Sequence, residues 1–588
     1  MGLADDLTRA GDQIRRNFDP EPEFHTLMSR RLATHTKLYG LVAVVAAVAV
    51  SLMPALFWPS PASASTKQIS IFQDNSVTTN PAGILPEIRA LGATTVRVFV
   101  TWYSLAPNGG STSAPKGFNG SDPADYPASK WAPYDQIVET AKQLGMTVDF
   151  ELTGGSPRWA SGANPPAGSS FVKDRAYQSW EPNAKLYGQF VHAVTERYDG
   201  TFKPSGASAA LPAVHFWSFW NEPDFGEDLG PQAINGSTEP VAPKYYRALL
   251  KAGWAALHQT QRGAKNTILI GELAAGGYTY PVPGHPSRLP GNAAITQALD
   301  FLRAAYCVGS NYRPLTGSLA KLYSCPTTAA ASRKFRAQNP ALFKATGFAN
   351  HPYDSTEAPN TNPSKIPAGY ATFPVLNRLA TALDKVTKAY GSGKRFPIYN
   401  DEYGYITRPP STSGADPSPA TAAIELNEAE YLSYKNPRVV SYDQYLLDDP
   451  RPNPGPGFSS GLFTSKGKAK ATLNAYELPV WLPKTTVRAG ANVEIWGGAR
   501  AAAFSQSATT PAAPTVEIQM QKGGAGSWTT IQTVKVSTTT GYFDIHSQLP
   551  YSGNLRLAYT YPQTEPFLPT NVAGSTIYGR TVKVAVSG

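Results

Sequence analysis

Two glutamates follow strand-like runs in positions that could support acid–base and nucleophilic chemistry. Glu222 ends the alternating aromatic run in 214-VHFWSFWNEPDFGE-227, and Glu402 stands in 398-IYNDEYG-404. Glycoside hydrolysis with retention requires two carboxyl groups about 5–5.5 Å apart, one to protonate the leaving oxygen and one to attack the anomeric carbon. The two glutamates are separated by 180 residues, so a pair forms only if the fold brings the two strand ends together.

Strand-like and helix-like segments alternate along residues 66–479. The expected strands cover residues 69–72, 95–102, 146–153, 214–220, 267–273, 345–353, 396–405 and 438–447. Amphipathic segments such as 134–145 lie between them and carry apolar residues at the helical period. Regular alternation indicates a parallel sheet, and eight units fit a (β/α)8 TIM barrel with long loops, an α/β fold. An open, doubly wound sheet is the alternative, although no glycine-rich phosphate loop supports it.

The pattern changes in residues 480–588. Short segments alternate apolar and polar residues and are separated by Gly, Ser, Thr and Pro; they cover residues 513–523, 528–538, 541–547 and 554–561. Short strands at this spacing predict a small C-terminal all-β sandwich domain. Substrate binding, attachment to a cell wall and packing on the barrel all remain open as roles for this domain.

Residues 1–65 are expected to form an N-terminal extension and signal peptide. The apolar run 38–58 has basic residues before it and an Ala62-x-Ala64 site after it. A retained membrane anchor is the alternative, because about 20 apolar residues can span a bilayer. Pro54 and the Ala-x-Ala site favour cleavage. In both cases the rest of the chain is exported, and it contacts a membrane only if the apolar run is retained.

Composition narrows the class of protein further. Aromatic residues make up 11% and charged residues 16%, which is typical of a folded, aromatic-rich chain, and the net charge is +10. No Lys/Arg block or nucleic-acid motif accompanies that charge, so we expect no nucleic-acid partner. Cys307 and Cys325 are the two cysteines. In an oxidising compartment they are expected to form a disulfide, with two free thiols as the alternative. Two cysteines offer too few ligands for a metal site, so we expect no bound metal. We also expect no cofactor.

The residues around both glutamates resemble a known superfamily. Trp220-Asn221-Glu222-Pro223 at the end of the fourth strand, with a glutamate ending the seventh, is similar to the retaining glycoside hydrolases of clan A, closest in flavour to families 39 and 5. The resemblance spans most of residues 66–479. It includes the stretches 102-WYSLAPNGG-110, 156-SPRWA-160 and 461-GLFTSKGKAKATLNAYELP-479.

The resemblance implies a role for several positions. Glu222 resembles the general acid/base and Glu402 the nucleophile. Asn221 resembles the amide that binds the sugar 2-hydroxyl, a contact that strengthens in the transition state. Arg97 resembles the second-strand arginine that helps to keep the nucleophile ionised, since an adjacent cation favours the charged form of a carboxyl group.

Other positions carry two interpretations. His351 and Tyr353 resemble the sixth-strand "H.Y" pair, with the tyrosine hydroxyl close to the nucleophile; contact with substrate and a scaffold role both stay open for each. Trp102 and Trp159 either stack on sugar faces or pack in the core. Glu151 and Glu272 either bind substrate hydroxyls or pair with Arg or Lys, and neither is assigned to the site.

Two features depart from the family pattern. Many members end the eighth strand with a tryptophan that floors the sugar site, and this chain has the residues 442-YDQY-445 there. In addition, Asp401 directly precedes Glu402. Neighbouring strand residues point to opposite sides, so we expect only one of the two carboxylates, Glu402, to enter the site.

These observations predict an exported retaining glycoside hydrolase that acts on a poly- or oligosaccharide by double displacement. A catalytically silent carbohydrate-binding or cell-surface protein on the same barrel is one alternative. A transglycosylase, which uses the same residues, is another.

Overall fold

The computed structural model describes residues 68–163, 165, 176–233, 239–277, 294–354, 357–451, 457–502, 514–537, 540–563 and 572–588. The expected extension and signal segment, residues 1–65, lies outside these described residues. Within them, no helix combines the length and the apolar character needed to cross a membrane.

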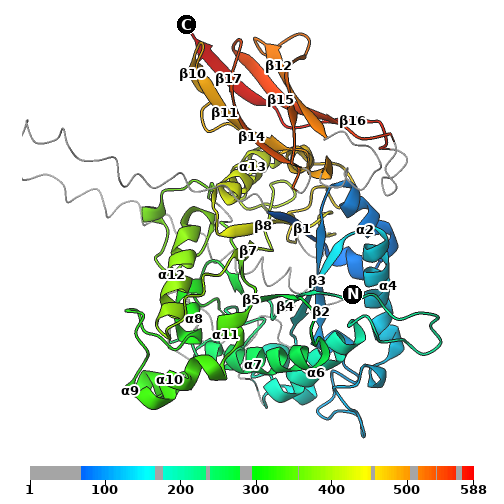
Figure 1. Cartoon of the computed structure of the whole chain (residues 1–588), viewed down its shortest axis with the longest axis vertical. Helices are drawn as coiled ribbons and strands as arrows, with labels where there is room; N and C mark the ends of the chain where they lie inside the picture. Colours follow the sequence, from blue (N-terminus) through cyan, green and yellow to red (C-terminus); the bar gives the residue numbers. More distant parts are fainter. Residues whose placement is uncertain are drawn as a thin grey trace, which may run out of the picture.

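Eight parallel strands close into a barrel in sequence order (Figure 1). The strands are β1 (Ile69–Gln73), β2 (Thr95–Thr101), β3 (Thr147–Thr153), β4 (Phe216–Phe219), β5 (Thr267–Ala274), β6 (Gly347–His351), β7 (Ile398–Asn400) and β8 (Val439–Tyr445). Each falls within, or within one residue of, a segment expected from the sequence. The predicted (β/α)8 barrel is therefore confirmed, and the open-sheet alternative is wrong.

Helices surround the barrel (Figure 1). The longer ones are α2 (Pro81–Ala90), α4 (Ala128–Gln143), α6 (Ala184–Arg197), α7 (Ala242–Thr260), α8 (Ala298–Ala305), α10 (Ala329–Gln338), α12 (Leu376–Lys388), α13 (Pro419–Lys435) and α14 (Ala471–Glu477). Short helices occupy the loops: η2 (Asn75–Thr78), α3 (Trp102–Leu105), η3 (Pro123–Asp125), η4 (Arg158–Ala160), α5 (Ala176–Ser179), α9 (Gly317–Leu322), α11 (Ala341–Lys344), η6 (Pro363–Lys365) and η7 (Phe373–Val375).

Helix α4 illustrates how the sequence pattern becomes packing. Tyr134, Ile137, Val138 and Ala141 recur at the helical period, and all four are buried. The helix ends just before Gly145, which takes a φ of 67° that glycine adopts at little cost. The burial of this face holds the helix against the barrel.

Strands β4 and β7 face each other across the barrel interior. The rings of Phe216 in β4 and Tyr399 in β7 lie 5.8 Å apart edge to face, and they belong to one apolar layer with Leu269 and Ala349. β4 and β7 lie three positions apart in the closed barrel, and their side chains meet across its interior. The residues that follow the two strands therefore face each other across the barrel mouth. This arrangement positions the two glutamates.

The C-terminal strands form two sheets that lie beside α13 (Figure 1). They are β9 (Val480–Trp481), β10 (Thr486–Arg488), β11 (Asn492–Gly498), β12 (Thr515–Lys522), β13 (Thr529–Lys535), β14 (Tyr542–Gln548), β15 (Gly553–Thr560), β16 (Thr576–Tyr578) and β17 (Val582–Ser587). One sheet has the order β10-β17-β15-β12-β13, with β16 beside β15, and the other has the order β14-β11-β9. Their apolar faces share one core, which contains Ile495, Ile518 and Leu557, as expected for a sandwich.

A buried arginine joins this all-β domain to the barrel. Arg500 donates to the Glu430 carboxylate of α13 at 2.7 Å and to the Tyr476 carbonyl of α14 at 3.0 Å. Its guanidinium also reaches the Ser70 hydroxyl at the start of β1, 3.2 Å away. Arg500 and Glu430 are both at most 3% exposed. A desolvated, hydrogen-bonded pair of this kind is costly to break, so the domain packs firmly on the barrel.

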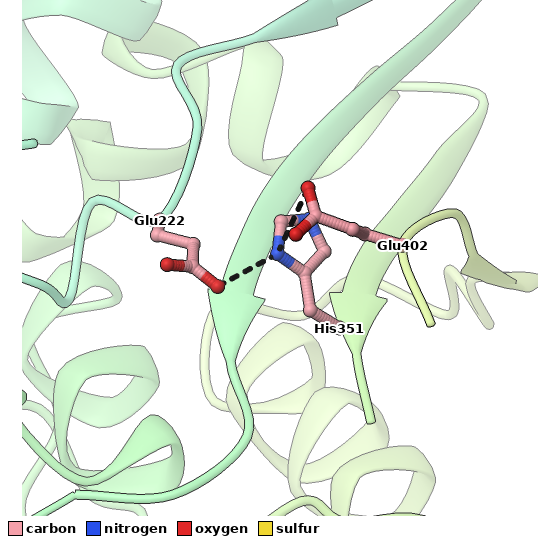
Figure 2. A group of neighbouring side chains, drawn as sticks. All are labelled: Glu222, His351 and Glu402. Carbon is pink, nitrogen blue, oxygen red and sulfur yellow. Dashed lines mark hydrogen bonds and ion pairs between the residues drawn. The ribbon is translucent and has the colours of Figure 1, made fainter. Parts of the chain in front are cut away.

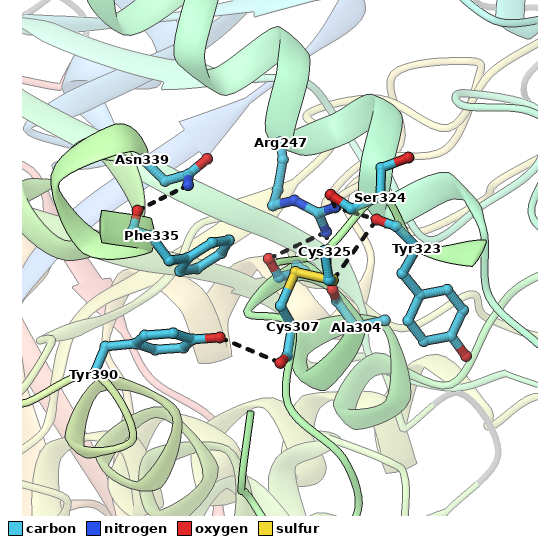
Figure 3. Close-up of a disulfide and its surroundings, with 10 residues drawn as sticks. Arg247, Ala304, Cys307, Tyr323, Ser324, Cys325, Phe335, Asn339 and Tyr390 are labelled. Atoms are coloured by element: carbon cyan, nitrogen blue, oxygen red, sulfur yellow. Dashed lines mark hydrogen bonds between the residues drawn. A yellow bond between two sulfur atoms is a disulfide. The ribbon is translucent and has the colours of Figure 1, made fainter. Parts of the chain in front are cut away.

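Cys307 and Cys325 form the disulfide expected from the sequence and close a loop with a sequence separation of 18 after α8. Figure 3 shows Arg247 of α7 beside it. Arg247 donates hydrogen bonds to backbone carbonyls near both cysteines, those of Ala304, Ala305, Tyr323 and Ser324. Burial lowers the pKa of Arg247 to about 10. The Tyr390 hydroxyl also donates to the Cys307 carbonyl at 3.2 Å.

Removing this disulfide should lower stability without changing the fold. For the Cys307→Ser, Cys325→Ser double variant we expect a loss of about 3 kcal/mol in the free energy of unfolding, because the closed loop no longer restricts the unfolded chain. Chemical denaturation of the variant, with reduced wild type as a matched control, measures the effect. Equal stability of oxidised and reduced wild type would contradict the expectation and would show that the hydrogen bonds from Arg247 and Tyr390 suffice to hold the loop.

Candidate active site

Charged and polar side chains from six strands, or from the residues directly after them, converge inside the barrel at its carboxyl end. They are Arg97 from β2, Glu151 from β3, Asn221 and Glu222 after β4, Glu272 from β5, His351 from β6, and Asp401 and Glu402 after β7. In a barrel of this type, the carboxyl ends of the strands carry the active site.

The backbone around Glu222 is strained. Strand β4 ends at Phe219, and Trp220 and Glu222 then take φ values of 66° and 36°, a region that residues with a side chain rarely adopt. Each such residue costs roughly 1–3 kcal/mol and persists only where its surroundings enforce it. Here the backbone N–H of Asn221 donates to the Thr153 hydroxyl at 3.0 Å, and the Trp220 indole N–H donates to the Asp228 backbone carbonyl at 3.1 Å. The strand therefore ends early, and this turn sets the direction of Glu222.

His351 lies between the two glutamates (Figure 2). Its Nδ1 is 2.9 Å from Oε1 of Glu222 and 4.0 Å from Oε2 of Glu402. One ligand atom from each of the three residues lies within 4.8 Å of the others. The Glu222 and Glu402 side chains are 17% and 11% exposed. The fold therefore brings the carboxyl groups of Glu222 and Glu402 close together, although the two residues are far apart in the sequence.

Two donors hold the carboxylate of Glu402. Arg97 donates to its Oε2 at 2.8 Å, and the Tyr353 hydroxyl donates to its Oε1 at 3.1 Å. Arg97 also donates to Asn221 Oδ1 at 3.2 Å, and the Asn221 amide donates to Asp228 Oδ2 at 3.3 Å. The contacts of Arg97 and Tyr353 that the family resemblance implies are present. Asp228 follows the quoted 214–227 run directly, and no sequence signal marked it.

The single guanidinium of Arg97 is shared by more carboxyl groups than it can neutralise. It donates to Glu272 at 3.0 Å and to Glu151 as well. Burial raises the pKa of Glu151 well above its usual range despite Arg97, and burial together with Glu272 does the same for Asp401. Burial opposes ionisation of Glu272 too, but Arg97 and His351 outweigh it and hold the pKa of Glu272 below its ordinary value. Arg97 and His351 therefore favour the charged form of Glu272, whereas burial favours the protonated forms of Glu151 and Asp401.

Strand alternation predicted that Asp401 points away from the site. In the structure its carboxyl group instead lies next to Arg97 and His351. Its Oδ2 is 3.9 Å from Arg97 Nε and its Oδ1 is 3.8 Å from His351 Nε2. The reason is that β7 ends at Asn400, so alternation no longer applies to the next two residues. Asp401 is nevertheless fully buried, and Glu402 is 8% exposed.

Of the two interpretations of Trp102, a sugar-stacking ring or a core residue, the structure favours the core residue. Trp102 is 0% exposed; it stacks on Phe190 of α6 and meets Tyr187 and Trp159 edge on, so no ring face is left for a ligand. Trp159 is partly buried, and its indole N–H donates to the Pro107 carbonyl at 3.3 Å.

Other aromatic rings lie beside Glu402. Tyr445 ends β8, where the family pattern has tryptophan, and its ring lies 5.2 Å from that of Phe458. Phe458 in turn lies 5.4 Å from Tyr353. The residues 442-YDQY-445 had suggested a different floor for the site. No sequence pattern marked Phe458, because it lies in the loop after β8, the last strand of the barrel.

Two groups of side chains have spacing that a metal ion could use, and both include His351. One consists of Glu222, His351 and Glu402, and the other of Glu272, His351 and Asp401. Arg97 NH2 lies 3.3 Å from His351 Nε2 and donates to Glu272, while NH1 of the same guanidinium donates to Glu402. A second cation would have to sit beside this guanidinium, so the donor set fits ion pairs better than a metal.

No family model matches the chain, and no curated protein matches it significantly. Among solved structures, a glucosidase from Croceicoccus marinus is similar, with 12% identity, 83% of this chain and 95% of that chain covered, and a TM-score of 0.40. An endo-beta-1,4-mannanase from Thermotoga petrophila has 12% identity, 89% and 98% coverage, and a TM-score of 0.36. A family 1 beta-glucosidase from Thermotoga maritima has 12% identity, 68% and 85% coverage, and a TM-score of 0.39. Scores this low assign no family, so the likeness to families 39 and 5 stays a prediction.

Proposed function

We propose that this chain is a retaining glycoside hydrolase that cleaves an O-glycosidic bond of a poly- or oligosaccharide. The observation that carries the proposal is the separation of the two partly exposed carboxylates, one oxygen of Glu222 and one of Glu402 lying within 4.8 Å. Retaining enzymes place their carboxyl groups about 5–5.5 Å apart, whereas inverting enzymes need about 6.5–9.5 Å to admit a water molecule. The short separation supports retention.

Glu402 acts as the nucleophile in this proposal. Its carboxylate attacks the anomeric carbon, and Glu222 gives its proton to the leaving oxygen as the glycosidic bond breaks. Glu222 then takes a proton from water, which attacks the same carbon and releases Glu402. The hydrogen bonds from Arg97 and Tyr353 orient the Glu402 carboxylate.

Substrate contacts are proposed for the groups around this pair. Asn221, held on one side by Arg97 and on the other by Asp228, is the candidate partner of the sugar 2-hydroxyl. Tyr353, Tyr445 and Phe458 offer aromatic surface next to Glu402, and such rings pack well against the apolar face of a sugar. Export through the N-terminal segment completes the proposal and fits an extracellular polysaccharide.

A screen of aryl glycosides and polysaccharides tests the function. For each substrate that is cleaved, NMR of the product formed first should show the same anomeric configuration as the substrate. An inverted product would contradict the proposal. Binding of a glycan without any cleavage would favour the silent carbohydrate-binding protein, and transfer of the glycosyl group to added sugars in preference to water would favour the transglycosylase.

A further inference from the structure

A second carboxylate stands behind His351 on the side away from Glu222. His351 is fully buried, its Nδ1 is 2.9 Å from Glu222 Oε1, and its Nε2 is 3.3 Å from Glu272 Oε2. The three side chains come from the end of β4, from β5 and from β6. The imidazole thus links the partly exposed Glu222 to Glu272, which is 0% exposed.

The backbone of β5 is built to direct Glu272 inward. Pairing of β5 with β6 shifts register between Ile270 and Leu273, which marks a bulge. Gly271 and Glu272 have φ values of 110° and 51°. A Cβ atom on Gly271 would lie 2.6 Å from the Ala349 carbonyl oxygen, so the bulge requires glycine there. A strained residue whose side chain is aimed at a buried histidine suggests a selected role for that side chain.

The charges around His351 are predominantly negative. The groups in direct contact are Arg97, Glu222, Glu272, Asp401 and Glu402. Glu151, Asp224 and Asp443 lie near enough to interact with the imidazolium in their charged forms, although burial raises the pKa of each. Burial by itself lowers the pKa of His351, but Glu402, Glu222 and Glu272 outweigh burial and Arg97 and raise that pKa well above its ordinary value. These carboxylates therefore favour the imidazolium form of His351, in which an N–H group faces each of the two glutamates.

We propose that Glu272 is a positioning residue: by accepting the Nε2–H of His351 it keeps Nδ1–H directed at Glu222 and sets how tightly the Glu222–His351 pair holds its protons. The inference rests on the proposed function, in which Glu222 releases a proton to the leaving oxygen and regains one from water. The Nδ1–H stays on His351 in both steps and stabilises the Glu222 carboxylate in between.

The matched variants are Glu272→Gln and Glu151→Gln. Both glutamates are fully buried and both bind Arg97 NH2, but of the two only Glu272 hydrogen-bonds His351. Replacing the carboxylate that accepts the Nε2–H should lower the affinity of the Glu222–His351 pair for protons. Glutamine at position 151 changes a side chain that is not bonded to the imidazole, so its effect on the pair should be much smaller.

Histidine NMR on the full chain, with the His351 signal assigned by its loss in His351→Asn, measures this without any substrate. We expect the midpoint of His351 titration to fall by about 1–3 pH units in Glu272→Gln, the usual effect of an adjacent opposite charge, and by less than about 0.5 unit in Glu151→Gln. Equal shifts in the two variants, or none in Glu272→Gln, would overturn the inference. If Glu272→Gln does not fold, wild type still decides, because a neutral His351 at pH 7 would contradict it.

The pH profile of kcat/KM gives the catalytic readout. The alkaline limb reports loss of an essential proton in the free enzyme, and it should move further toward lower pH in Glu272→Gln than in Glu151→Gln. A lower rate in Glu272→Gln with an unmoved limb would indicate a purely structural role. If wild type cleaves no glycan, the proposed function fails, and the NMR midpoints still test the link between Glu272 and His351.

Discussion

Glu402→Ala should lower kcat/KM by about 10⁴-fold or more on every glycoside that wild type cleaves. Removal of a nucleophile from a hydrolase typically has an effect of this size, and it corresponds to about 5 kcal/mol of lost transition-state stabilisation. The variant should still fold, because Arg97 keeps its hydrogen bonds to Glu151 and Glu272. Steady-state kinetics on an aryl glycoside, with circular dichroism to verify folding, measure the loss.

Azide separates the loss of a nucleophile from general damage. In Glu402→Ala, azide can enter the space of the missing carboxylate and attack the anomeric carbon directly, so the product should be a glycosyl azide of inverted configuration. Asp401→Asn is the matched control, since Asp401 is the neighbouring carboxyl group and is 0% exposed; we expect it to lose less than about tenfold. Full activity in Glu402→Ala would contradict the mechanism, and a larger loss in Asp401→Asn would transfer the role to Asp401.

The barrel itself could be predicted because its signals are local. The run 95–102 is rich in β-branched residues, and residues 134–145 carry apolar side chains at the helical period. Both patterns arise from burial of one face of a single element, so each can be recognised without the rest of the chain. Eight such alternations leave few arrangements other than a closed parallel barrel.

Glu222 and Glu402 could be proposed as partners because both stand at strand ends, and all eight carboxyl ends meet on one side of the barrel. The contacts inside the site were harder to foresee. Alternation predicted that Asp401 would point away from Arg97, but β7 ends one residue too early for that rule to hold. For Glu272 the sequence leaves two roles open, a substrate ligand and an ion-pair partner. The direction of its side chain depends on the bulge at Gly271, and that bulge is visible only in the register of β5 against β6.

Trp102 shows the limit of reasoning from residue type. A tryptophan after a strand is compatible with sugar stacking and with core packing, and the neighbours that decide between them, Tyr187 and Phe190, come from α6, more than 80 residues away in sequence. Phe458 was missed for the opposite reason. It gains its place beside Tyr353 from the path of a loop, and loops carry no period that could predict it.

Glu222→Ala should show a loss that depends on the leaving group. For glycosides with poor leaving groups we expect kcat/KM to fall by about 10²–10⁴-fold, the usual contribution of a general acid. Aryl glycosides whose phenol leaves readily should lose much less, since their oxygen departs without a proton. The alkaline limb of the pH profile should also disappear in the variant, because no proton remains to be lost from residue 222.

The stereochemistry of azide rescue then separates the two glutamates. In Glu222→Ala the glycosyl–Glu402 ester still forms, and azide attacks it from the side that Glu222 vacates, so the glycosyl azide should retain the configuration of the substrate. Glu402→Ala should give the inverted azide from the same substrate. Opposite configurations from two side chains that both approach His351 Nδ1 can arise only if the two carboxylates act on opposite faces of the sugar. Retained azide from both variants, or inverted azide from both, would contradict that division of roles.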